Sequence, residues 1–309
     1  MAYINGIGSI TIQNQEQLVI PDISAYIPPM LARRMSTIVK RAIVSSKMAL
    51  TDAALEMPDA IIAGTGLGCI EDTEKFLISM IQNNETLLQP THFIQSTHNT
   101  ISSQIAMLLK CYGYNNTYSH LGISFESALL DAFLQIQTGA CQNVLVGGYD
   151  EMTPNYHLML SKNHFWDGCF SGEGCISFVV SNQQNQHSYC KIEAIELFYR
   201  PKSTEETKDY VFNFLKNKNL TKRDLDAVML GYSGNQKNDS VYNAMSDFWG
   251  NLPRLTYRQF SGEFFTATAF GIKFAAQMLK TQIHSPIHRI IFHQHFQNNT
   301  HALILLSVC

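Results

Sequence analysis

Apolar residues recur at helical spacing from Phe125 to Ile136. This pattern predicts a buried helix that begins just after Gly122 and runs to Gln137, because a glycine follows closely and ends it. Residues 143–148 then form a short apolar run that closes on two glycines, which is typical of a buried strand whose end approaches a pocket. The pattern therefore predicts a strand, a sharp turn, a helix and a second strand.

Several other segments share the order and spacing of one enzyme family. They are Ala32-Arg-Arg-Met35 before a helical stretch to Leu50, the glycine-rich residues 61–68, Gln104-Ile-Ala106, Val146-Gly-Gly148 and Ser171-Gly-Glu-Gly-Cys-Ile176. Each is weak by itself, but together they cover nearly the whole amino-terminal half in the right order. With residues 117–154, which have the form of a condensing-enzyme nucleophile elbow, the chain resembles the β-ketoacyl synthase family of the thiolase fold.

The resemblance implies an α/β protein with a thiolase-like fold, in which duplicated halves give a five-layered α/β/α/β/α arrangement. The sequence agrees with two halves, since residues 181–188 form a polar, Gln/Asn-rich connector between two apolar runs. We expect an amino-terminal half with a degenerate nucleophile elbow at residues 1–183 and a carboxy-terminal half at residues 188–309.

In this family the elbow carries the cysteine that accepts the acyl chain. Counting back from Gly139 by the family's helix length places that position at Gly122. Counting forward from Gly113 places it a little later, near Phe125, if the turn carries an insertion or deletion. Neither count reaches a cysteine. Decarboxylative condensation needs a thiolate to hold the acyl chain as a thioester, and glycine supplies no nucleophile.

The other catalytic positions that the resemblance implies are also substituted. The first histidine position falls at Gly231, the lysine position at Arg258 and the second histidine position at Glu263. An ionised Glu263 accepts hydrogen bonds but cannot donate them, so it would oppose an enolate unless burial kept it protonated. Losing one such donor typically costs about 10²-fold to 10³-fold in rate. We hypothesise that Glu263 pairs with Arg258 instead.

The resemblance then implies a noncatalytic subunit of the chain-length-factor type, which pairs with an active ketosynthase and bounds the growing acyl chain. The segment FESALLDA is similar to condensing-enzyme relatives of aryl-polyene and flexirubin-type pigment clusters, so fatty-acid or polyene-type biosynthesis is the expected context. The expected partners are an active ketosynthase in a heterodimer, or a second copy in a homodimer, and an acyl carrier protein. No cofactor is expected, since the phosphopantetheine of the carrier protein carries the substrate.

Two alternatives stay open at this stage. The chain could be an active 3-oxoacyl synthase or acyltransferase with a nucleophile other than cysteine, for which Ser124 with His120 is the candidate pair. It could also be a homodimeric protein that only binds acyl chains. The sequence does not distinguish clearly between such an acyl-binding homodimer and the noncatalytic partner subunit.

Four side chains are expected to line the pocket of the former active site: Phe125, Phe264, His295 and Phe296. If the three phenylalanines meet in one closed cluster, acyl binding within this subunit is disfavoured. His293 and His295 share one face of an extended segment, which is geometrically open to metal binding. A polar pocket lining explains the alternation more simply, so no metal site is expected.

Composition limits the remaining functions. A formal net charge of -3 and a charged fraction of 15% give no basic surface of the kind that nucleic acid needs. Arg33, Arg34, Lys40 and Arg41 are spaced to share part of a helix surface. They are the candidate docking residues for an acidic carrier protein, although a solvated helix face is the simpler interpretation.

Seven cysteines at irregular spacing, with no CxxC pair, argue against a disulfide framework and a zinc site. Cys169 lies in a loop near the expected entrance of the active site, but nothing in such a loop supplies the helix amino terminus that would lower its pKa. No apolar run is long enough to span a membrane and the amino terminus lacks a signal pattern, so the cytoplasm is the expected location.

Overall fold

The computed structural model describes residues 1–12, 18, 20–86, 88–165, 167–282 and 287–309. Its strands fall into two sets of five. The first set is β1 (Ala2–Thr11), β2 (Ala60–Gly64), β3 (Tyr114–Tyr118), β4 (Asn143–Asp150) and β5 (Gly174–Ser181). The second set is β6 (Cys190–Tyr199), β7 (Ala227–Leu230), β8 (Arg254–Thr256), β9 (Arg289–Phe296) and β10 (Thr300–Ser307).

The two sets repeat one another in strand order and in pairing direction. The first runs β3-β2-β4-β5-β1 and the second runs β8-β7-β9-β10-β6, so each strand has a counterpart at the same position. β2 pairs in parallel with β3 and β4, as β7 does with β8 and β9. β5 and β10 are antiparallel to both neighbours. A short pairing of residues 2–4 with residues 190–192 joins the sets. The backbone is therefore duplicated.

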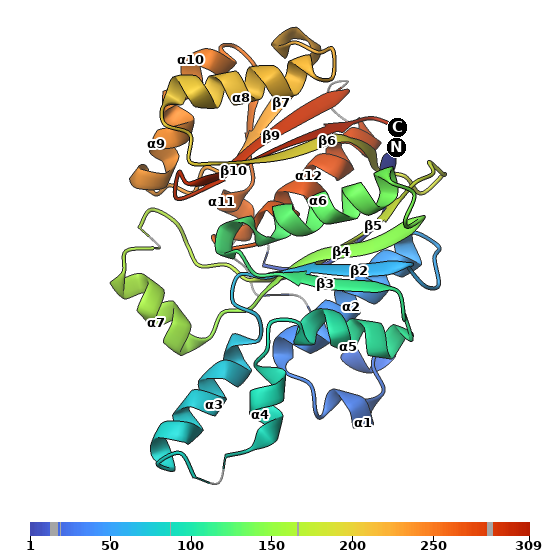
Figure 1. The fold of residues 1–309 in the computed structure, drawn as a ribbon, viewed down its shortest axis with the longest axis vertical. Coiled ribbons are helices and arrows are strands. Elements are labelled where there is room, and N and C mark those ends of the chain that lie inside the picture. Colours follow the sequence, from blue (N-terminus) through green and yellow to red (C-terminus); the bar gives the residue numbers. More distant parts are fainter. Residues whose placement is uncertain (13–17, 19, 87, 166, 283–286) are drawn as a thin grey trace.

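Helices form three layers around the two sets of strands (Figure 1). The middle layer is α6 (Ser124–Gln137) and α12 (Thr268–Thr281). α2 (Thr37–Asp52) and α5 (Thr100–Leu109) cover the outer face of the first set. α8 (Thr204–Lys216), α9 (Gln236–Ala244) and α10 (Ser246–Trp249) lie outside the second set. The expected five-layered α/β/α/β/α arrangement is confirmed.

The remaining helices lie outside these layers or are single turns. α3 (Ile70–Gln82), α4 (Pro90–Gln95) and α7 (Pro154–Lys162) project from the body (Figure 1). α1 (Pro29–Ala32) and α11 (Arg258–Ser261) are short, and 3-10 turns span Ile23–Ala25, Leu121–Ile123 and Lys222–Asp224. Within the ranges given above, no helix has both the length and the apolar character needed to cross a bilayer.

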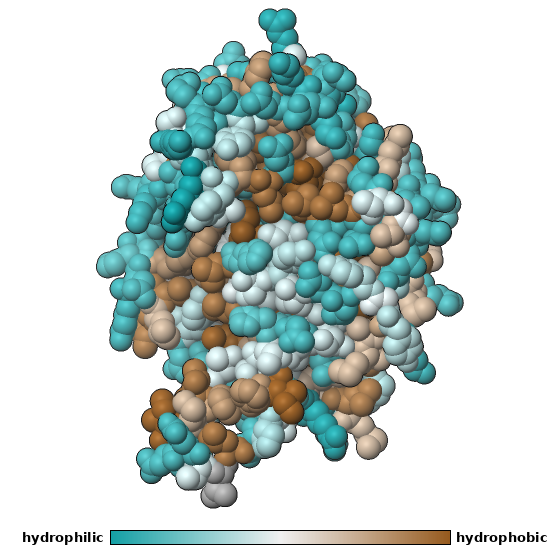
Figure 2. Space-filling model, viewed as in Figure 1, coloured by the Kyte–Doolittle hydropathy of each residue, from teal (hydrophilic) through white to brown (hydrophobic). Residues whose placement is uncertain are grey.

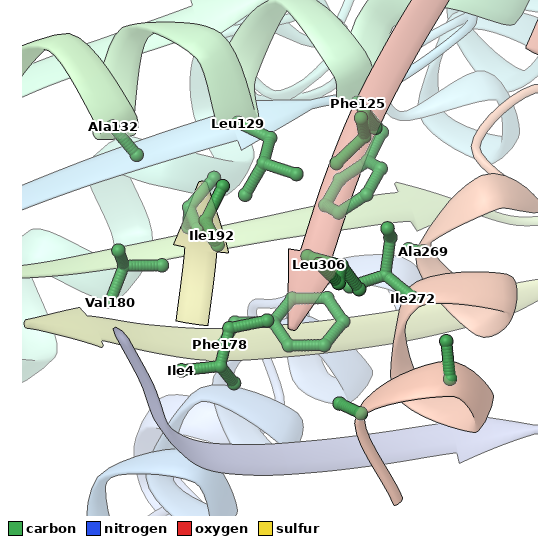
Figure 3. Packing of buried hydrophobic residues seen from close by; sticks show 14 of the residues in the cluster. Ile4, Phe125, Leu129, Ala132, Phe178, Val180, Ile192, Ala269, Ile272 and Leu306 are labelled. Atoms are coloured by element: carbon green, nitrogen blue, oxygen red, sulfur yellow. The ribbon is translucent and has the colours of Figure 1, made fainter. Parts of the chain in front are cut away.

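The predicted helix is the centre of the largest core. α6 begins at Ser124 and ends at Gln137, and Gly139 follows with φ +75°, so the predicted bounds are confirmed. Burying one large apolar side chain stabilises a fold by about 1.5–3 kcal/mol. Figure 3 shows the side chains that pack here: Phe125, Leu129 and Ala132 of α6, Ile4, Phe178, Val180, Ile192 and Leu306 of the strands, and Ala269 and Ile272 of α12. This core joins both halves around α6 and fixes the turn at its start.

Candidate functional site

The turn between β3 and α6 is where the resemblance places the nucleophile. β3 ends at Tyr118, and Leu121 takes φ +53°, which is uncommon for a residue with a side chain. The buried Ser124 hydroxyl holds this turn. It accepts a hydrogen bond from the backbone N–H of His120 (2.7 Å) and donates one to the carbonyl oxygen of Leu121 (2.7 Å). The predicted sequence of strand, sharp turn and helix is present.

Gly122, in this turn, has no space for a side chain. A Cβ built on it would lie 2.3 Å from Cδ2 and 2.8 Å from Cγ of Phe296. Phe296 ends β9, and its ring also packs edge-on against that of Phe265, with 5.9 Å between centroids. An aromatic ring from the second half therefore fills the position where the resemblance places the nucleophile, and a cysteine could stand there only if Phe296 moved.

Gly231, at the position of the first family histidine, is enclosed in the same way. A Cβ on it would lie 2.2 Å from Oε1 of Gln294 and 2.8 Å from the hydroxyl of Tyr242. The same Oε1 accepts hydrogen bonds from the hydroxyls of Tyr242 (3.2 Å) and Tyr257 (3.0 Å). The Tyr257 hydroxyl also lies 3.2 Å from that of Thr268, at the start of α12. A closed network of neutral hydrogen bonds takes the place of an imidazole.

Arg258 and Glu263, at the lysine and second histidine positions, form a buried ion pair. Nη1 of Arg258 contacts Oε2 of Glu263, and each side chain is less than a tenth exposed. Burial raises the pKa of Glu263, and the guanidinium opposes this effect. Burial alone would lower the pKa of Arg258, but the Glu263 carboxylate together with Tyr257 and Tyr242 outweighs burial and raises that pKa. The hypothesised pairing is present, so the carboxylate faces a cation.

Backbone contacts hold the loop that carries Glu263. Its N–H donates to the carbonyl oxygen of Phe170 (2.9 Å), and its own carbonyl accepts from the N–H of Gly172 (2.9 Å). Nearby, Gly168 and Gly234 lie back to back at φ +83° and +89°, and a Cβ on Gly168 would be 2.1 Å from the Gly234 carbonyl oxygen. Glycine alone fits this conformation and contact readily. A first-half loop is thus held between two loops of the second half.

A cavity of about 580 Å³ opens beside these filled positions. Gly122, Gly231 and the Arg258–Glu263 pair line it, together with polar residues from the start of α9 and from the β9–β10 turn. His295 and Phe296 line it as predicted. The cavity therefore lies where the resemblance places the active site, and its walls present amides and an ion pair together with the side chains of Lys237 and His295.

The phenylalanines expected at this pocket do not meet in one cluster. Phe125 lies in the central core, where its ring is 5.7 Å from that of Phe178, and Phe264 belongs to the same core. Neither lines the cavity, whereas Phe265 does. The prediction is wrong for Phe125 and Phe264, because apolar spacing does not distinguish a ring that faces the core from a neighbour that faces a pocket.

Ser124 and His120 are not arranged as a nucleophile and its base. Both hydrogen bonds of the Ser124 hydroxyl go to the backbone, and the side chain is fully buried. Nδ1 of His120 lies 3.3 Å from the hydroxyl of Ser127 instead, and that hydroxyl donates to the carbonyl oxygen of Ile123 (2.9 Å). These contacts give Ser124 a structural role in the turn.

The described residues give little support for a reactive thiolate or a bound metal ion at this site. Burial raises the pKa of Cys169 to about 12, and the charge of Glu263 adds to this effect, so the thiol stays protonated. All seven cysteines are free thiols. His293 and His295 lie on one face of β9, but in the part of the chain that the structure describes no three or more His, Cys, Asp or Glu side chains are placed to hold a metal ion.

The four basic residues considered for carrier docking do not share one helix surface. Arg33 and Arg34 follow α1, whereas Lys40 and Arg41 lie in α2, which begins after Ser36. Arg41 is bound to Glu173 at 2.9 Å. Arg33 and Lys40 line a common depression beside α1. The expected single surface is wrong because the chain breaks between two helices at this point.

Sequence reasoning missed Asp150, the last residue of β4. Its carboxylate accepts hydrogen bonds from the N–H of Gly66 (2.8 Å) and from the N–H (2.7 Å) and hydroxyl (2.8 Å) of Thr266. Burial raises the pKa of Asp150 to about 6 against these donors. Because Gly66 and Thr266 belong to different halves, Asp150 joins them near the cavity. An acidic residue two positions after a pair of glycines in an apolar strand was the available signal.

The fold and the placement of this cavity together define a ketosynthase-like protein. The family model described as the β-ketoacyl synthase N-terminal domain matches residues 11–204, more than half of the chain. The chain therefore belongs to the β-ketoacyl synthase family. A comparison with curated protein sequences found no match.

Solved structures show the same fold at low sequence identity. One is a type II PKS acyl-carrier protein in complex with its ketosynthase bound to the hexaketide (TM-score 0.83, 15% identity, 100% of this chain and 99% of that chain). Another is the ishigamide ketosynthase/chain length factor (TM-score 0.83, 12% identity, 100% and 99%). A third is a ketosynthase in complex with its chain length factor from Xenorhabdus doucetiae (TM-score 0.80, 13% identity, 100% and 98%). The expected thiolase-like fold is confirmed.

Proposed function

We propose that this chain is a noncatalytic subunit of the chain-length-factor type, which pairs with an active ketosynthase in fatty-acid or polyene-type biosynthesis. The observation that carries the proposal is the Phe296 ring, 2.3 Å from where a Cβ of residue 122 would stand. A substrate thioester would find no thiolate there, and Gln294 and Glu263 offer no pair of imidazole donors to a developing enolate. The subunit keeps the fold and lacks the groups that react.

The two edges of the sheet support pairing with a second subunit of the same fold. β8 is three residues long, follows Pro253 and begins with Arg254, and these features discourage strand pairing. β3, with the sequence YNNTY, has no charged residue and no proline, and it pairs on one side only among the described strands. An edge without such protection readily takes another strand. We therefore propose that a ketosynthase covers β3.

Exposed apolar side chains also support a partner. Met107 in α5 and Tyr112, just before β3, are 62% and 93% exposed. Figure 2 shows a second group on the α3–α4 projection, which includes Ile81, Phe93 and Ile94. Single exposed apolar residues are ordinary on a protein surface, but groups of them mark interaction surfaces.

In the proposed complex the partner's cysteine receives the acyl chain, and an acyl carrier protein delivers it on phosphopantetheine. The similar structures include a ketosynthase with its carrier protein and a ketosynthase with its chain length factor, which supports both kinds of partner. Arg33 and Lys40 are the proposed contacts for the acidic carrier protein. We place the complex in aryl-polyene or flexirubin-type pathways, as the segment FESALLDA suggests.

Co-expression with an active β-ketoacyl synthase from the same source tests this function. We expect a one-to-one heterodimer by light scattering, and condensation of malonyl-carrier protein only when both subunits are present. The matched control is the same pair with the partner's nucleophilic cysteine replaced by alanine, which should keep the heterodimer and lose condensation. A homodimer that ignores the synthase would instead favour the acyl-binding alternative, and condensation by this chain alone would favour the enzyme.

A further inference from the structure

Three histidines lie together on one face of β9 and β10. His293 and His295 alternate along β9, and His301 is the register partner of His295 on β10. Nε2 of His293 lies 3.1 Å from Nδ1 of His301, and the rings of His295 and His301 are 5.6 Å apart between centroids. All three side chains are at most 5% exposed. We call these three residues the histidine stack.

Aromatic rings from the outer layer cover the histidine stack. Tyr242 of α9 lies 4.6 Å from the His295 ring, and Trp249 of α10 lies 6.4 Å from the His293 ring. Phe198 of β6 stacks on the His301 ring at 4.8 Å. The stack therefore joins α9 and α10 to the sheet below them.

Among the described residues, no acidic side chain acts appreciably on the three rings of the histidine stack. The nearby carboxylates are Glu263, which pairs with Arg258, and Asp239 of α9, which accepts hydrogen bonds from the backbone N–H groups of Ser233 and Gly234. From α9 Tyr242 also faces the stack, and burial raises its pKa, so it stays neutral. Tyr210 of α8 stacks on Phe198 behind the cluster. Arg258 of α11 acts on His295 as a positive charge. An imidazolium in the stack would thus meet other imidazoles and a guanidinium.

His295 also connects two walls of the cavity. Its Nε2 lies 3.0 Å from the carbonyl oxygen of Asn238 in α9, and its Nδ1 accepts a hydrogen bond from the N–H of Asn298 (3.3 Å) in the β9–β10 turn. Both neighbours line the cavity. A carbonyl only accepts and an N–H only donates, so both bonds require a neutral ring with its proton on Nε2. A proton on Nδ1 breaks the bond to Asn298.

We propose that the histidine stack is an acid-sensitive closure of the cavity, in which neutral rings hold α9 and the β9–β10 turn together and protonation releases them. The closed state favours neutral rings, since burial lowers the pKa of His295 to about 3 and of His301 to about 4, and that of His293 well below its usual range. In an opened state the rings would titrate near about 6.5. Each ring then raises the ratio of open to closed molecules by up to about tenfold per pH unit as the pH falls from about 6.5 to about 4.

Trp249 provides a direct readout of this opening. The chain has two tryptophans, so Trp166→Phe leaves Trp249, which is 3% exposed, as the only indole. We expect its acrylamide quenching constant to rise several-fold between pH 7.5 and pH 4.5 while the far-UV circular dichroism stays native. The exposed control His98→Gln should leave the rise unchanged, and His295→Gln or His301→Phe, which cannot take up the proton, should reduce it. A quenching constant that does not change with pH, or an equal rise in all variants, overturns the proposal.

The protonation state of His295 can be measured without any variant. Nitrogen chemical shifts of ¹⁵N-labelled imidazole should show the Nε2–H tautomer of His295 at pH 7.5, and an Nδ1–H tautomer overturns the proposal. Both experiments use the isolated chain, so their outcome is independent of whether a ketosynthase partner binds.

Discussion

The turns that precede the two central helices are filled by different kinds of interaction. Before α6, Gly122 has no side chain, and the ring of Phe296 fills the space. Before α12, Arg258 and Glu263 retain charged side chains that neutralise each other. An aromatic ring therefore fills the first turn sterically, and an ion pair neutralises the charges at the second. The comparison shows that two turns at corresponding places in the duplicated fold are stabilised by unrelated interactions, one steric and one electrostatic.

Each half supplies a side chain that contacts the turn of the other half. Phe296 belongs to the second half and closes the turn of the first, while Asp150 of the first half holds Thr266 beside the turn of the second. Each turn therefore depends on the other half for its conformation. A variant that disturbs either turn should therefore lower the stability of the whole molecule. The size of the loss should differ between the turn filled by an aromatic ring and the turn held by an ion pair.

The largest effect is expected where charge closes the site. Glu263→Ala leaves the Arg258 guanidinium buried without its partner, and breaking a buried pair in this way costs about 3–5 kcal/mol in the free energy of unfolding. Urea unfolding at pH 7.5 measures it. The double variant Arg258→Met with Glu263→Leu is the control and should stay within about 1 kcal/mol of the parent. If Glu263→Ala is as stable as the parent, the buried ion pair does not stabilise this turn.

The next effect concerns Glu126, in the first turn of α6. Its side chain is fully buried and neither carboxyl oxygen makes a hydrogen bond of normal geometry among the described residues. Burial raises its pKa to about 7 against a weaker opposing effect of the nearby Thr268 side chain. Because the folded pKa lies above the usual value, this group disfavours folding as the pH rises from about 4.5 to about 7. Glu126→Gln should therefore stabilise the protein by about 2–3 kcal/mol at pH 8 and by little at pH 4.5.

The exposed Glu56→Gln is the matched control for this prediction and should change stability at neither pH. Thermal unfolding across pH 4.5–8 provides the comparison. An unchanged Tm difference between Glu126→Gln and the parent at both ends of that range would show that Glu126 is not desolvated in the folded state.

A smaller effect is expected where shape closes the site. Gly122→Cys places a thiol against Phe296, and overpacking of this kind costs about 1–3 kcal/mol. Adding Phe296→Ala provides room, so the double variant should recover part of the loss and expose the new thiol to iodoacetamide. If Gly122→Cys alone is as stable as the parent and labels as quickly as the double variant, the ring does not fill the elbow.

The smallest effect is expected at Ser124. Removing its hydroxyl leaves the His120 N–H without a partner in the turn, and Ser124→Ala should cost about 1 kcal/mol. Ser161→Ala, which removes an exposed hydroxyl that bonds within α7, should cost less. Chemical denaturation distinguishes the two, and a Ser124→Ala protein of parental stability would remove the structural role of this serine.

The sequence predicted most of the fold because periodic patterns are local. The spacing from Phe125 to Ile136 and the glycine at 139 fix the bounds of α6, and the apolar run from residue 143 predicts β4, which continues two residues beyond the two glycines to Asp150. The Arg258–Glu263 pair could also be proposed, since two opposite charges fall close together in the chain. These features need no knowledge of what lies opposite in space.

The site was predicted less well because its contacts are long-range. No local pattern reveals that Phe296 meets Gly122, or that Phe265 rather than Phe264 faces the cavity. The break between Arg34 and Lys40 separates basic residues that helical spacing would have joined. Asp150 bonds Thr266 across the two halves, which spacing along one strand cannot indicate.

The central claim is that no residue of this chain can hold an acyl group covalently. The most direct test is intact mass spectrometry after incubation of the chain, alone and with the proposed ketosynthase partner, with acylated carrier protein. The account predicts an unmodified mass for this chain in both cases and an acyl adduct on the partner. An acyl adduct on this chain, for example one mapped to Ser124 or Cys169, would contradict it.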